Sequence, residues 1–498
     1  MEMSTQKTSV ILQPIRQTRK EHSKPFGTES FDGEPFRMVE PLTAEVYKEV
    51  VTRFAPSPTG FLTLGNYRTA LFNFLFARQH GGKFILRIED TDKERSKKEF
   101  EEDILESFKW LNLSYNEFYR QSDRQEIYRN YLQKLLDEGK AYVSKESDVK
   151  EGESPSTELR TRRSEVIRFK NSGQKVCFKD LIRGEICFDT TELGDFVIAK
   201  SIDEPIFHFA VVVDDFEMGV THVIRGEDHI SNTPRHILLG QALGAPQPIY
   251  AHLPLMLATD RSKLSKRNGA ISIRECKEKG YLPEAIINCL ALLGWNPGTD
   301  QEILSLENLL AQFNLEKIQK GGAVFNEEKL NWLNHEYMKK LPKEALVPLV
   351  SEWIEKSGKL SITDTALLEK IAPLIIERVE KFEDITKMAT AGELDYFFTS
   401  PDYPIEKLIW KDGNKEDTKT HLTEAKKMLE TLSDNEFTVV TIREKIWEYA
   451  EKNGRGNVLW PLRFALSGKD KSPDPFTLGG VLGKTETLKR LGSAISKL

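Results

Sequence analysis

Two segments about two hundred residues apart hold the side chains best suited to chemistry in this chain. The first runs from Arg53 to Asn66 and reads RFAPSPTGFLTLGN, which predicts a strand, a Gly-containing turn and the start of a helix. The second is the basic stretch KLSKR at 263–267, which lies between Asp260 and Gly269 and predicts an exposed loop. Amides at a helix N-terminus bind phosphates, and lysines stabilise charge on a leaving group. The pair therefore suits a bound triphosphate.

Three residues at the start of the expected helix are the first candidates for catalysis. Gly65 leaves the backbone open to a nucleotide because it has no side chain. Asn66 and Thr63 offer short hydrogen-bond donors beside it. We therefore expect Thr63, Gly65 and Asn66 to act in catalysis and in ATP binding. An ordinary Gly-containing turn is the alternative that this motif alone leaves open.

Two further segments lie between these: RIEDTD at 87–92, and VVDD at 212–215 followed by RGEDH at 225–229. In this order, the segments resemble those of class I aminoacyl-tRNA synthetases, specifically the bacterial glutamyl-tRNA synthetases. The resemblance extends from about Val50 to Leu498. The family's first signature is His-x-Gly-His, and both of its histidine positions differ in this chain.

The basic loop closely matches the family's second signature. The resemblance implies that Lys266 contacts the α- or β-phosphate of ATP and that Lys263 steadies the loop or the pyrophosphate. Both are expected to be catalytic. Ser265, Arg267 and Asp228 complete the expected ATP-binding set, with Asp228 near the adenosine. Such a loop can close over ATP, and a solvated surface loop is the alternative.

The resemblance also implies a site for the amino acid. A guanidinium is the natural partner of a carboxylate, so Arg53 is expected on the side-chain carboxylate and Glu89 on the α-ammonium. Phe207 stands where the family has a tyrosine, which removes one donor. The alternative is a structural network of ion pairs at strand ends. The expected glutamate-binding residues are Arg53, Ala55, Ser57, Glu89, Phe207 and Arg225.

The hydrophobic pattern predicts the domains that must position these residues. A strand, a helix and a second strand with a Gly-rich first turn are typical of a doubly wound α/β sheet. We expect an α/β Rossmann-like catalytic domain with a β-rich insert, and the family resemblance implies that an all-α anticodon-binding domain follows it. In the catalytic domain, residues 207–213 are predicted as a strand. After that domain, residues 275–293 are predicted as helical. The expected boundaries are a flexible extension at 1–45, the catalytic domain at 46–274 with its insert at about 141–200, a helical stem-contact region at 275–335 and the anticodon-binding domain at 336–498.

Composition indicates a soluble globular protein. Hydrophobic residues make up 39% and charged residues 30%, and the net charge is −6. No apolar run approaches the ~20 residues of a membrane span, and the N-terminal residues lack the layout of a signal peptide. We expect a cytoplasmic monomer that does not bind membranes. An acidic chain counts mildly against nucleic-acid binding, so the tRNA expectation depends on the motifs.

Neither the cysteines nor the aspartates predict a protein-held metal ion. Two cysteines without a histidine in the insert cannot fill a four-ligand zinc site, so we expect no zinc and buried thiols in a reducing compartment. The acidic pairs at 90, 92, 214 and 215 are expected to cap helices and form ion pairs, with Mg²⁺ arriving on ATP. The four cysteines are Cys177, Cys187, Cys276 and Cys289.

The expected function is the ATP-dependent attachment of L-glutamate to the 3′ end of tRNA(Glu) through a glutamyl-adenylate. Charging of tRNA(Gln) as well stays open. The departures at Thr63 and Phe207 leave one rival, a tRNA-binding paralogue without synthetase activity. A second rival is an unrelated ligase that forms other acyl-adenylates. Arg53, Glu89 and Arg225, together with the anticodon region, argue against it.

Overall fold

The computed structural model describes residues 49–145, 165–264, 271–362 and 364–498. The expected extension at 1–45 lies outside these residues. So do three members of the basic loop, namely Ser265, Lys266 and Arg267.

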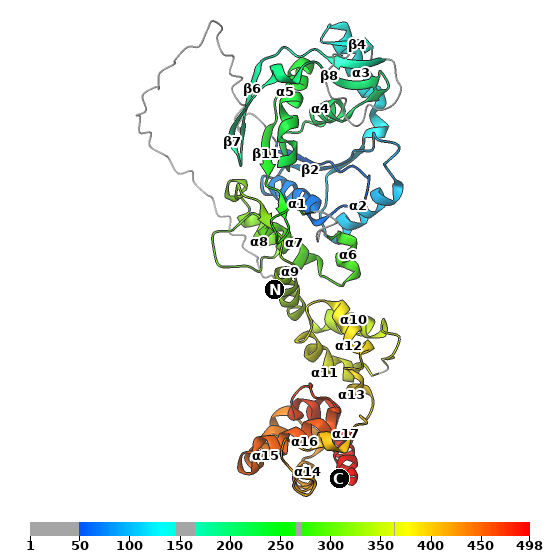
Figure 1. Cartoon of the computed structure of the whole chain (residues 1–498), viewed down its shortest axis with the longest axis vertical. Coiled ribbons are helices and arrows are strands. Elements are labelled where there is room, and N and C mark those ends of the chain that lie inside the picture. Colours follow the sequence, from blue (N-terminus) through cyan, green and yellow to red (C-terminus); the bar gives the residue numbers. More distant parts are fainter. Residues whose placement is uncertain (1–48, 146–164, 265–270, 363) are drawn as a thin grey trace, which may run out of the picture. The chain divides into compact units, whose positions relative to one another are not determined.

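A seven-stranded sheet forms the centre of the catalytic region (Figure 1). Its strands pair in parallel except at the β6–β7 hairpin, which is antiparallel. From one edge to the other they are β3 (Glu117–Arg120), β2 (Lys83–Ile88), β1 (Val51–Phe54), β10 (His222–Gly226), β11 (Ile249–Leu253), β6 (Lys175–Asp180) and β7 (Gly184–Asp189). The strand order reverses between β1 and β10, and ligands of such sheets bind at this switch point.

Helices cover both faces of the sheet. Alternate residues of β2 point to opposite sides: Phe84 and Leu86 pack in one apolar cluster and Ile85 in another. The first cluster contains α1 (Leu64–Gln79), and the second contains α4 (Phe207–Glu217) and α5 (Thr233–Leu243). The strand ends are therefore held between two packed layers. Further helices of the region are α2 (Lys98–Trp110) and α3 (Gln125–Asp137).

The β-rich insert divides between two sheets. The β6–β7 hairpin extends the main sheet through a parallel pairing of β6 with β11. The other insert strands form a separate four-stranded antiparallel sheet beside α3 (Figure 1). These strands are β4 (Ala141–Lys145), β5 (Glu165–Phe169), β8 (Phe196–Ser201) and β9 (Glu204–Pro205).

One expected element is wrong. Residues 207–213, predicted as a strand, form the first part of α4. Packing of Phe209 and Val213 against the sheet overrides the β-propensity of the three consecutive valines. The stretch expected to be helical at 275–293 contains two helices, α6 (Ile273–Glu278) and α7 (Pro283–Leu292), and Gly280 takes a positive φ of 75° between them.

The expectation of buried thiols is wrong for two of the four cysteines. Cys177 and Cys187 lie directly opposite each other on β6 and β7 and form a disulfide. The Cys187 side chain is exposed at this edge of the sheet. Directly opposed residues in an antiparallel pair bring their Cβ atoms within bonding reach. Cys276 and Cys289 are buried and unbonded, as expected.

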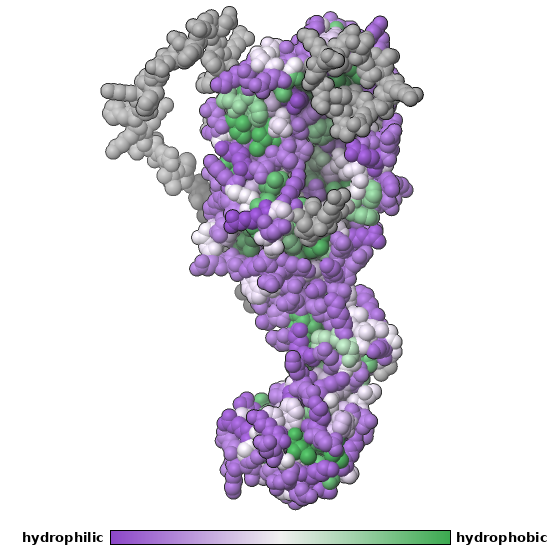
Figure 2. Space-filling model, in the orientation of Figure 1, coloured by the Kyte–Doolittle hydropathy of each residue, from purple (hydrophilic) through white to green (hydrophobic). Residues whose placement is uncertain are grey.

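The described residues after the sheet are largely helical, and those from 338 onward contain no strand. The face in Figure 2 is mostly hydrophilic over this part of the chain. None of the described helices has the length and apolar character to span a bilayer. A short β12 (Met256–Leu257) pairs with β13 (Ala323–Val324), and the helices are α8 (Leu306–Gln312), α9 (Glu327–Lys339), α10 (Lys343–Glu355), α11 (Thr365–Ile376), α12 (Phe382–Thr390), α13 (Asp395–Phe398), α14 (Lys415–Glu430), α15 (Val439–Asn453), α16 (Arg455–Ser467) and α17 (Pro475–Lys497).

Candidate active site

The first motif forms the N-terminus of α1. Thr63 is its N-cap residue, and both its backbone N–H and its hydroxyl donate to Asn66 Oδ1, at 3.0 and 3.1 Å. The hydroxyl proton of Thr63 is therefore committed to the cap, whereas the amide nitrogen of Asn66 takes no part in it. A Cβ added to Gly65 would meet no atom closer than the sulfur of Met256, at 3.5 Å. Internal packing thus does not require glycine here, which fits close approach of a ligand to the backbone.

The described ends of the basic loop lie beside this helix start. On one side, the Leu264 N–H donates to the carbonyl of Met256 at 2.9 Å. On the other, the Leu64 N–H donates to the carbonyl of Ile271 at 3.2 Å, and Thr63 bridges to Ser272. The first motif therefore lies beside the described residues on either side of 265–270.

Two expected ATP-binding residues also meet there. Lys263 Nζ lies 3.7 Å from Asp228 Oδ2, and both side chains are about half exposed. Asp228 sits close over Gly226, where a Cβ would come within 2.4 Å of its Oδ1. A side chain at position 226 would displace this carboxylate. An exposed ion pair contributes little to stability, so both charges are available to a ligand.

A chain of alternating charges links Arg53 on β1 to Glu89 at the end of β2. Arg53 Nε donates to Asp215 Oδ1 at 3.1 Å, and Arg87 Nη1 donates to the same oxygen at 2.7 Å. Arg87 Nη2 donates to Glu89 Oε1 at 3.0 Å. Among the described residues, the outer nitrogens Nη1 and Nη2 of Arg53 have no hydrogen-bond partner. This leaves a guanidinium edge that can bind a carboxylate in a bidentate manner.

The pKa values of the two acids in this network are shifted in opposite directions. Burial raises the pKa of Glu89 to about 7, and its contact with Arg87 only partly offsets that shift. Burial also opposes ionisation of Asp215, but Arg53 and Arg87 outweigh it and hold the pKa below its usual value. Asp215 is thus an anion at neutral pH, whereas the ionised form of Glu89 would be stabilised by a further cation placed beside it.

Histidines surround the guanidinium of Arg225 at the end of β10. Its Nε donates to His252 Nε2 at 3.2 Å, and its Nη1 donates to His236 Nδ1 at 3.1 Å. His236 Nε2 lies 3.1 Å from His208 Nδ1. Burial lowers the pKa of all three histidines, to about 4 for His208, so they are neutral at pH 7. Burial also lowers the pKa of Arg225, to about 10, which keeps it cationic.

The remaining expected glutamate-binding residues lie nearby. Phe207 is the first residue of α4, and its ring centroid is 6.1 Å from those of both His229 and His236. Its ring carries no hydroxyl where the family tyrosine has one. Ala55 is half-buried and Ser57 is exposed in the turn after β1. The structure places these expected positions near one another, and Asp215 forms the kind of ion pair expected from the sequence. The sequence contained no signal for the supporting residues His236 and His252.

The other aspartates considered for a metal have protein partners. Asp214 is fully buried and accepts from Gln121, Arg124 and Tyr128 at 2.7–2.9 Å. The carboxylate of Asp90 accepts from the Ser122 backbone at 2.8 Å. Within the described part of the chain, no group of three or more His, Cys, Asp or Glu side chains has metal-binding geometry.

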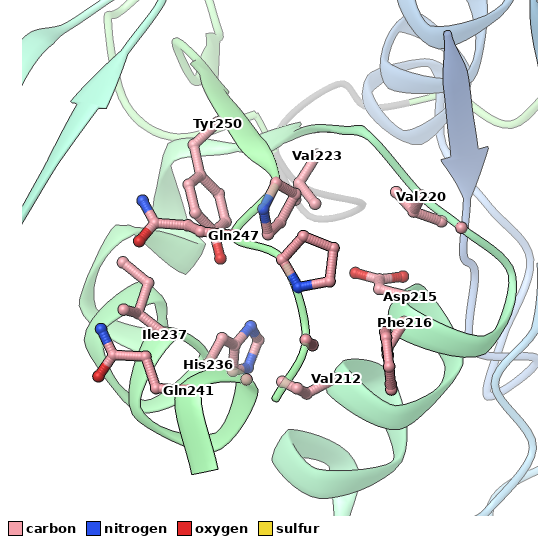
Figure 3. A pocket seen from close by; sticks show the side chains of 15 residues that line it. Val212, Asp215, Phe216, Val220, Val223, His236, Ile237, Gln241, Gln247 and Tyr250 are labelled. Carbon is pink, nitrogen blue, oxygen red and sulfur yellow. The ribbon is translucent and has the colours of Figure 1, made fainter. Parts of the chain in front are cut away.

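A pocket of about 190 Å³ adjoins the arginine network (Figure 3). Val212, Phe216 and Ile237 give it mostly apolar walls. Asp215 and His236 also line it, and these are the residues that hold Arg53 and Arg225. An apolar pocket does not match a dicarboxylate, so the arginine network is the better candidate for the amino-acid site.

Comparison with known proteins agrees with this fold. A family model described as "tRNA synthetases class I (E and Q), catalytic domain" matches residues 49–153 and 146–332, and one described as "Anticodon binding domain" matches 345–495. Two curated relatives are a glutamate–tRNA ligase of Thermodesulfovibrio yellowstonii, 43% identical, and one of Aquifex aeolicus, 42% identical. Each match covers 90% of this chain and 99% of the relative.

Solved structures give the same result. A crystal structure of a glutamate tRNA ligase from Elizabethkingia meningosepticum, in complex with its amino acid, matches with a TM-score of 0.78 and 33% identity. The match covers 91% of this chain and all of that one. A glutamate-tRNA synthetase from Elizabethkingia anophelis matches with a TM-score of 0.75, also at 33% identity.

The chain therefore belongs to the class I tRNA synthetases of the E and Q family. Within that family it matches glutamate–tRNA ligases over nearly the whole of their length. The expected family, the expected fold class and the expected glutamate–tRNA ligase activity are confirmed at this level. The roles of individual site residues stay predictions.

Proposed function

We propose that this protein activates L-glutamate with ATP and transfers it to the 3′ end of tRNA(Glu) at the switch point between β1 and β10. The observation that carries the proposal is the convergence of three charge types there. The helix start and the basic loop suit phosphates, the open edge of Arg53 suits a carboxylate, and Glu89 suits an ammonium. A dicarboxylic amino acid and a triphosphate need this combination.

The amino acid is bound by opposite charges at its two ends. The outer nitrogens of Arg53 take the side-chain carboxylate, and Arg225 supports it from β10. Glu89 accepts the α-ammonium, which favours the ionised form of its carboxyl group. This arrangement leaves the α-carboxylate facing the phosphate-binding motif, where it attacks the α-phosphorus of ATP. Ala55, Ser57 and Phe207 complete the amino-acid site in this proposal.

Catalysis consists of positioning and charge stabilisation. The backbone N–H of Gly65 and the amide nitrogen of Asn66 donate to phosphate oxygens, with Gly65 allowing close approach. Lys263 and Lys266 stabilise charge on the departing pyrophosphate, and Ser265, Arg267 and Asp228 complete the ATP site. Mg²⁺ bound to ATP would neutralise part of the phosphate charge. Among the described residues no acidic cluster could hold the ion, so its ligands would be ATP oxygens and water.

The domain division expected from the sequence is part of the same proposal. The residues up to about 335 act on glutamate, ATP and the acceptor end of the tRNA, and the helices of 336–498 bind the anticodon region. A monomer that works in the cytoplasm is expected. Whether tRNA(Gln) is also charged depends on contacts of the tRNA with the helical region, and a charging experiment with tRNA(Gln) answers it.

Aminoacylation with labelled glutamate tests this proposal directly. We expect ATP-dependent charging of tRNA(Glu), no charging with labelled glutamine, and a comparison with tRNA(Gln) that shows how far the enzyme discriminates. The paralogue hypothesis, motivated by Thr63 and Phe207, predicts that tRNA binds but is never charged. Tight tRNA binding without any charging would replace the synthetase proposal with that one.

A further inference from the structure

Asp180 at the end of β6 is a buried carboxylate with no role assigned so far. Its side chain is fully enclosed, and both of its oxygens are occupied. Oδ1 accepts from the backbone N–H groups of Ile182 and Arg183 at 2.9 and 2.8 Å. Oδ2 accepts from the backbone N–H of His252 at 3.0 Å and from its ring Nδ1 at 2.7 Å. The insert hairpin is thereby tied to β11.

The donors and acceptors around His252 define its tautomer. A carboxylate only accepts, so the hydrogen of the neutral ring must be on Nδ1 and the lone pair on Nε2. That lone pair accepts the Nε–H of Arg225 at 3.2 Å. The Thr233 hydroxyl lies 3.2 Å from Nε2 and 3.2 Å from the carbonyl of His229, and both atoms can accept its hydrogen. Asp180 thus ensures that His252 presents an unprotonated Nε2, a hydrogen-bond acceptor, to the Nε–H of Arg225.

This contact completes the immobilisation of Arg225. A guanidinium has five N–H hydrogens, and four have partners. One bonds to His252 and one to His236, and the two on Nη2 bond to Thr233 at 2.8 Å and to the carbonyl of His229 at 3.3 Å. The remaining hydrogen, on Nη1, is the one that a substrate can use. Its direction follows from the other four bonds.

We propose that Asp180 is a positioning residue for the amino-acid site: by keeping the hydrogen of His252 on Nδ1, it orients the Arg225 guanidinium so that one N–H faces the glutamate carboxylate. The inference depends on the proposed function, because it assumes that Arg225 contacts glutamate. It also gives the β6–β7 hairpin a task, since β6 pairs with β11 only at Asp180 and Tyr250.

The variant Asp180→Asn tests this with little change in size. The asparagine amide donates where the carboxylate accepted, so His252 moves its hydrogen to Nε2 and opposes the Nε–H of Arg225. We expect the KM for glutamate to rise about 10- to 100-fold, in line with the loss of a second-layer partner. The KM for ATP and the kcat at saturating glutamate should change less than about threefold. An unchanged KM for glutamate in folded Asp180→Asn overturns the proposal.

Two His252 variants keep the test decisive if Asp180→Asn does not fold. In His252→Gln the amide oxygen can accept from Arg225 whatever stands at position 180, whereas His252→Ala leaves Arg225 without that acceptor. We expect a glutamate KM near the wild-type value for His252→Gln and a raised one for His252→Ala. Equal values for the two variants would refute the orienting role.

Nitrogen NMR of histidine-labelled wild-type protein reads the tautomer without any activity measurement. The expected signal for His252 at pH 7 is a neutral ring protonated at Nδ1, and a ring protonated at Nε2 contradicts the proposal. Arg225→Lys separates this inference from the proposed function. If Arg225→Lys leaves the KM for glutamate unchanged, the assignment of the amino-acid site fails. If it raises the KM but Asp180→Asn does not, only the role of Asp180 fails.

Discussion

Arg53 on β1 and Asp215 on α4 form an ion pair in which Nε of the arginine donates to Oδ1 of the aspartate at 3.1 Å. The side chains are 162 positions apart and both are largely buried. Because the pair uses only Nε, it leaves the two outer nitrogens of Arg53 without a hydrogen-bond partner among the described residues. In the proposed function, the pair holds Arg53 so that these nitrogens bind a carboxylate.

The first prediction follows from this pair. Asp215→Asn removes the charge that fixes Arg53 and Arg87, so we expect the KM for glutamate to rise by about tenfold with a smaller change in kcat. Steady-state kinetics of the glutamate-dependent exchange of pyrophosphate into ATP measure this KM and the kcat. The neighbouring Asp214→Asn is the control: Asp214 bonds to Arg124 and Tyr128 and approaches Arg87 only at 3.7 Å, so its loss should mainly lower the melting temperature. A glutamate KM unaltered by Asp215→Asn would argue against Arg53 as the carboxylate partner.

The second prediction concerns pH. Burial raises the pKa of Glu89 to about 7, and only the ionised form attracts the α-ammonium of glutamate. The Kd for glutamate should therefore rise as the pH falls from about 8 to about 6, and level off above the pKa. Calorimetric titrations across this range measure it. Glu89→Gln should bind weakly at every pH and lose the dependence, whereas a pH-independent Kd in the wild type would exclude Glu89 from the ammonium site.

The third prediction concerns the departure from the family pattern at Thr63. Its hydroxyl caps α1 through Asn66, so Thr63→Ala removes one cap contact, worth about 1 kcal/mol. It leaves the oxygen of Asn66 with the backbone N–H of residue 63 as its remaining cap partner. We expect the rate of adenylate formation to fall more than the KM for ATP rises. Single-turnover measurements separate the two, with Thr63→Ser as the matched control that keeps the hydroxyl. Identical rates in wild type, Thr63→Ala and Thr63→Ser would remove Thr63 from the catalytic set.

The fourth prediction concerns the hairpin disulfide. Cys177 and Cys187 close a loop of 10 residues, and such cross-links typically stabilise by about 2–4 kcal/mol. Cys177→Ser should lower the melting temperature of the oxidised protein. Reductant should lower that of the wild type to the same value and leave the variant unchanged. A wild-type melting temperature that does not respond to reductant would mean that the thiols are not bonded in solution.

Local pattern predicted the elements that carry the motifs but not the contacts between them. The helix at Leu64–Gln79 begins where the Gly-rich turn predicts, because cap and apolar stripe agree. The three valines of α4 favoured a strand, since β-propensity is a local quantity and the packing of α4 on the sheet is not. The opposition of Cys177 and Cys187 depends on strand register, which their spacing does not determine.

Part of the candidate site could be predicted from the order of the strands in the sheet. Arg53 lies near the end of β1 and Arg225 near the end of β10, and Glu89 directly follows β2. These parallel strands end at the same edge of the sheet, so the closeness of the three residues follows from topology. Asp180, His236 and His252 act through tautomers and hydrogen bonds across elements far apart in sequence. Single aspartates and histidines carry no motif, so only the folded arrangement identifies them.

Glutamate-dependent exchange of pyrophosphate into ATP tests the central claim most directly. It requires the amino-acid site, the start of α1 and the basic loop to work together, and it should be run with and without tRNA(Glu) and with glutamine as control. The account predicts exchange with glutamate, especially in the presence of tRNA, and none with glutamine. No exchange under any condition, in a folded protein that still binds tRNA, would contradict it and favour a paralogue that has lost activation.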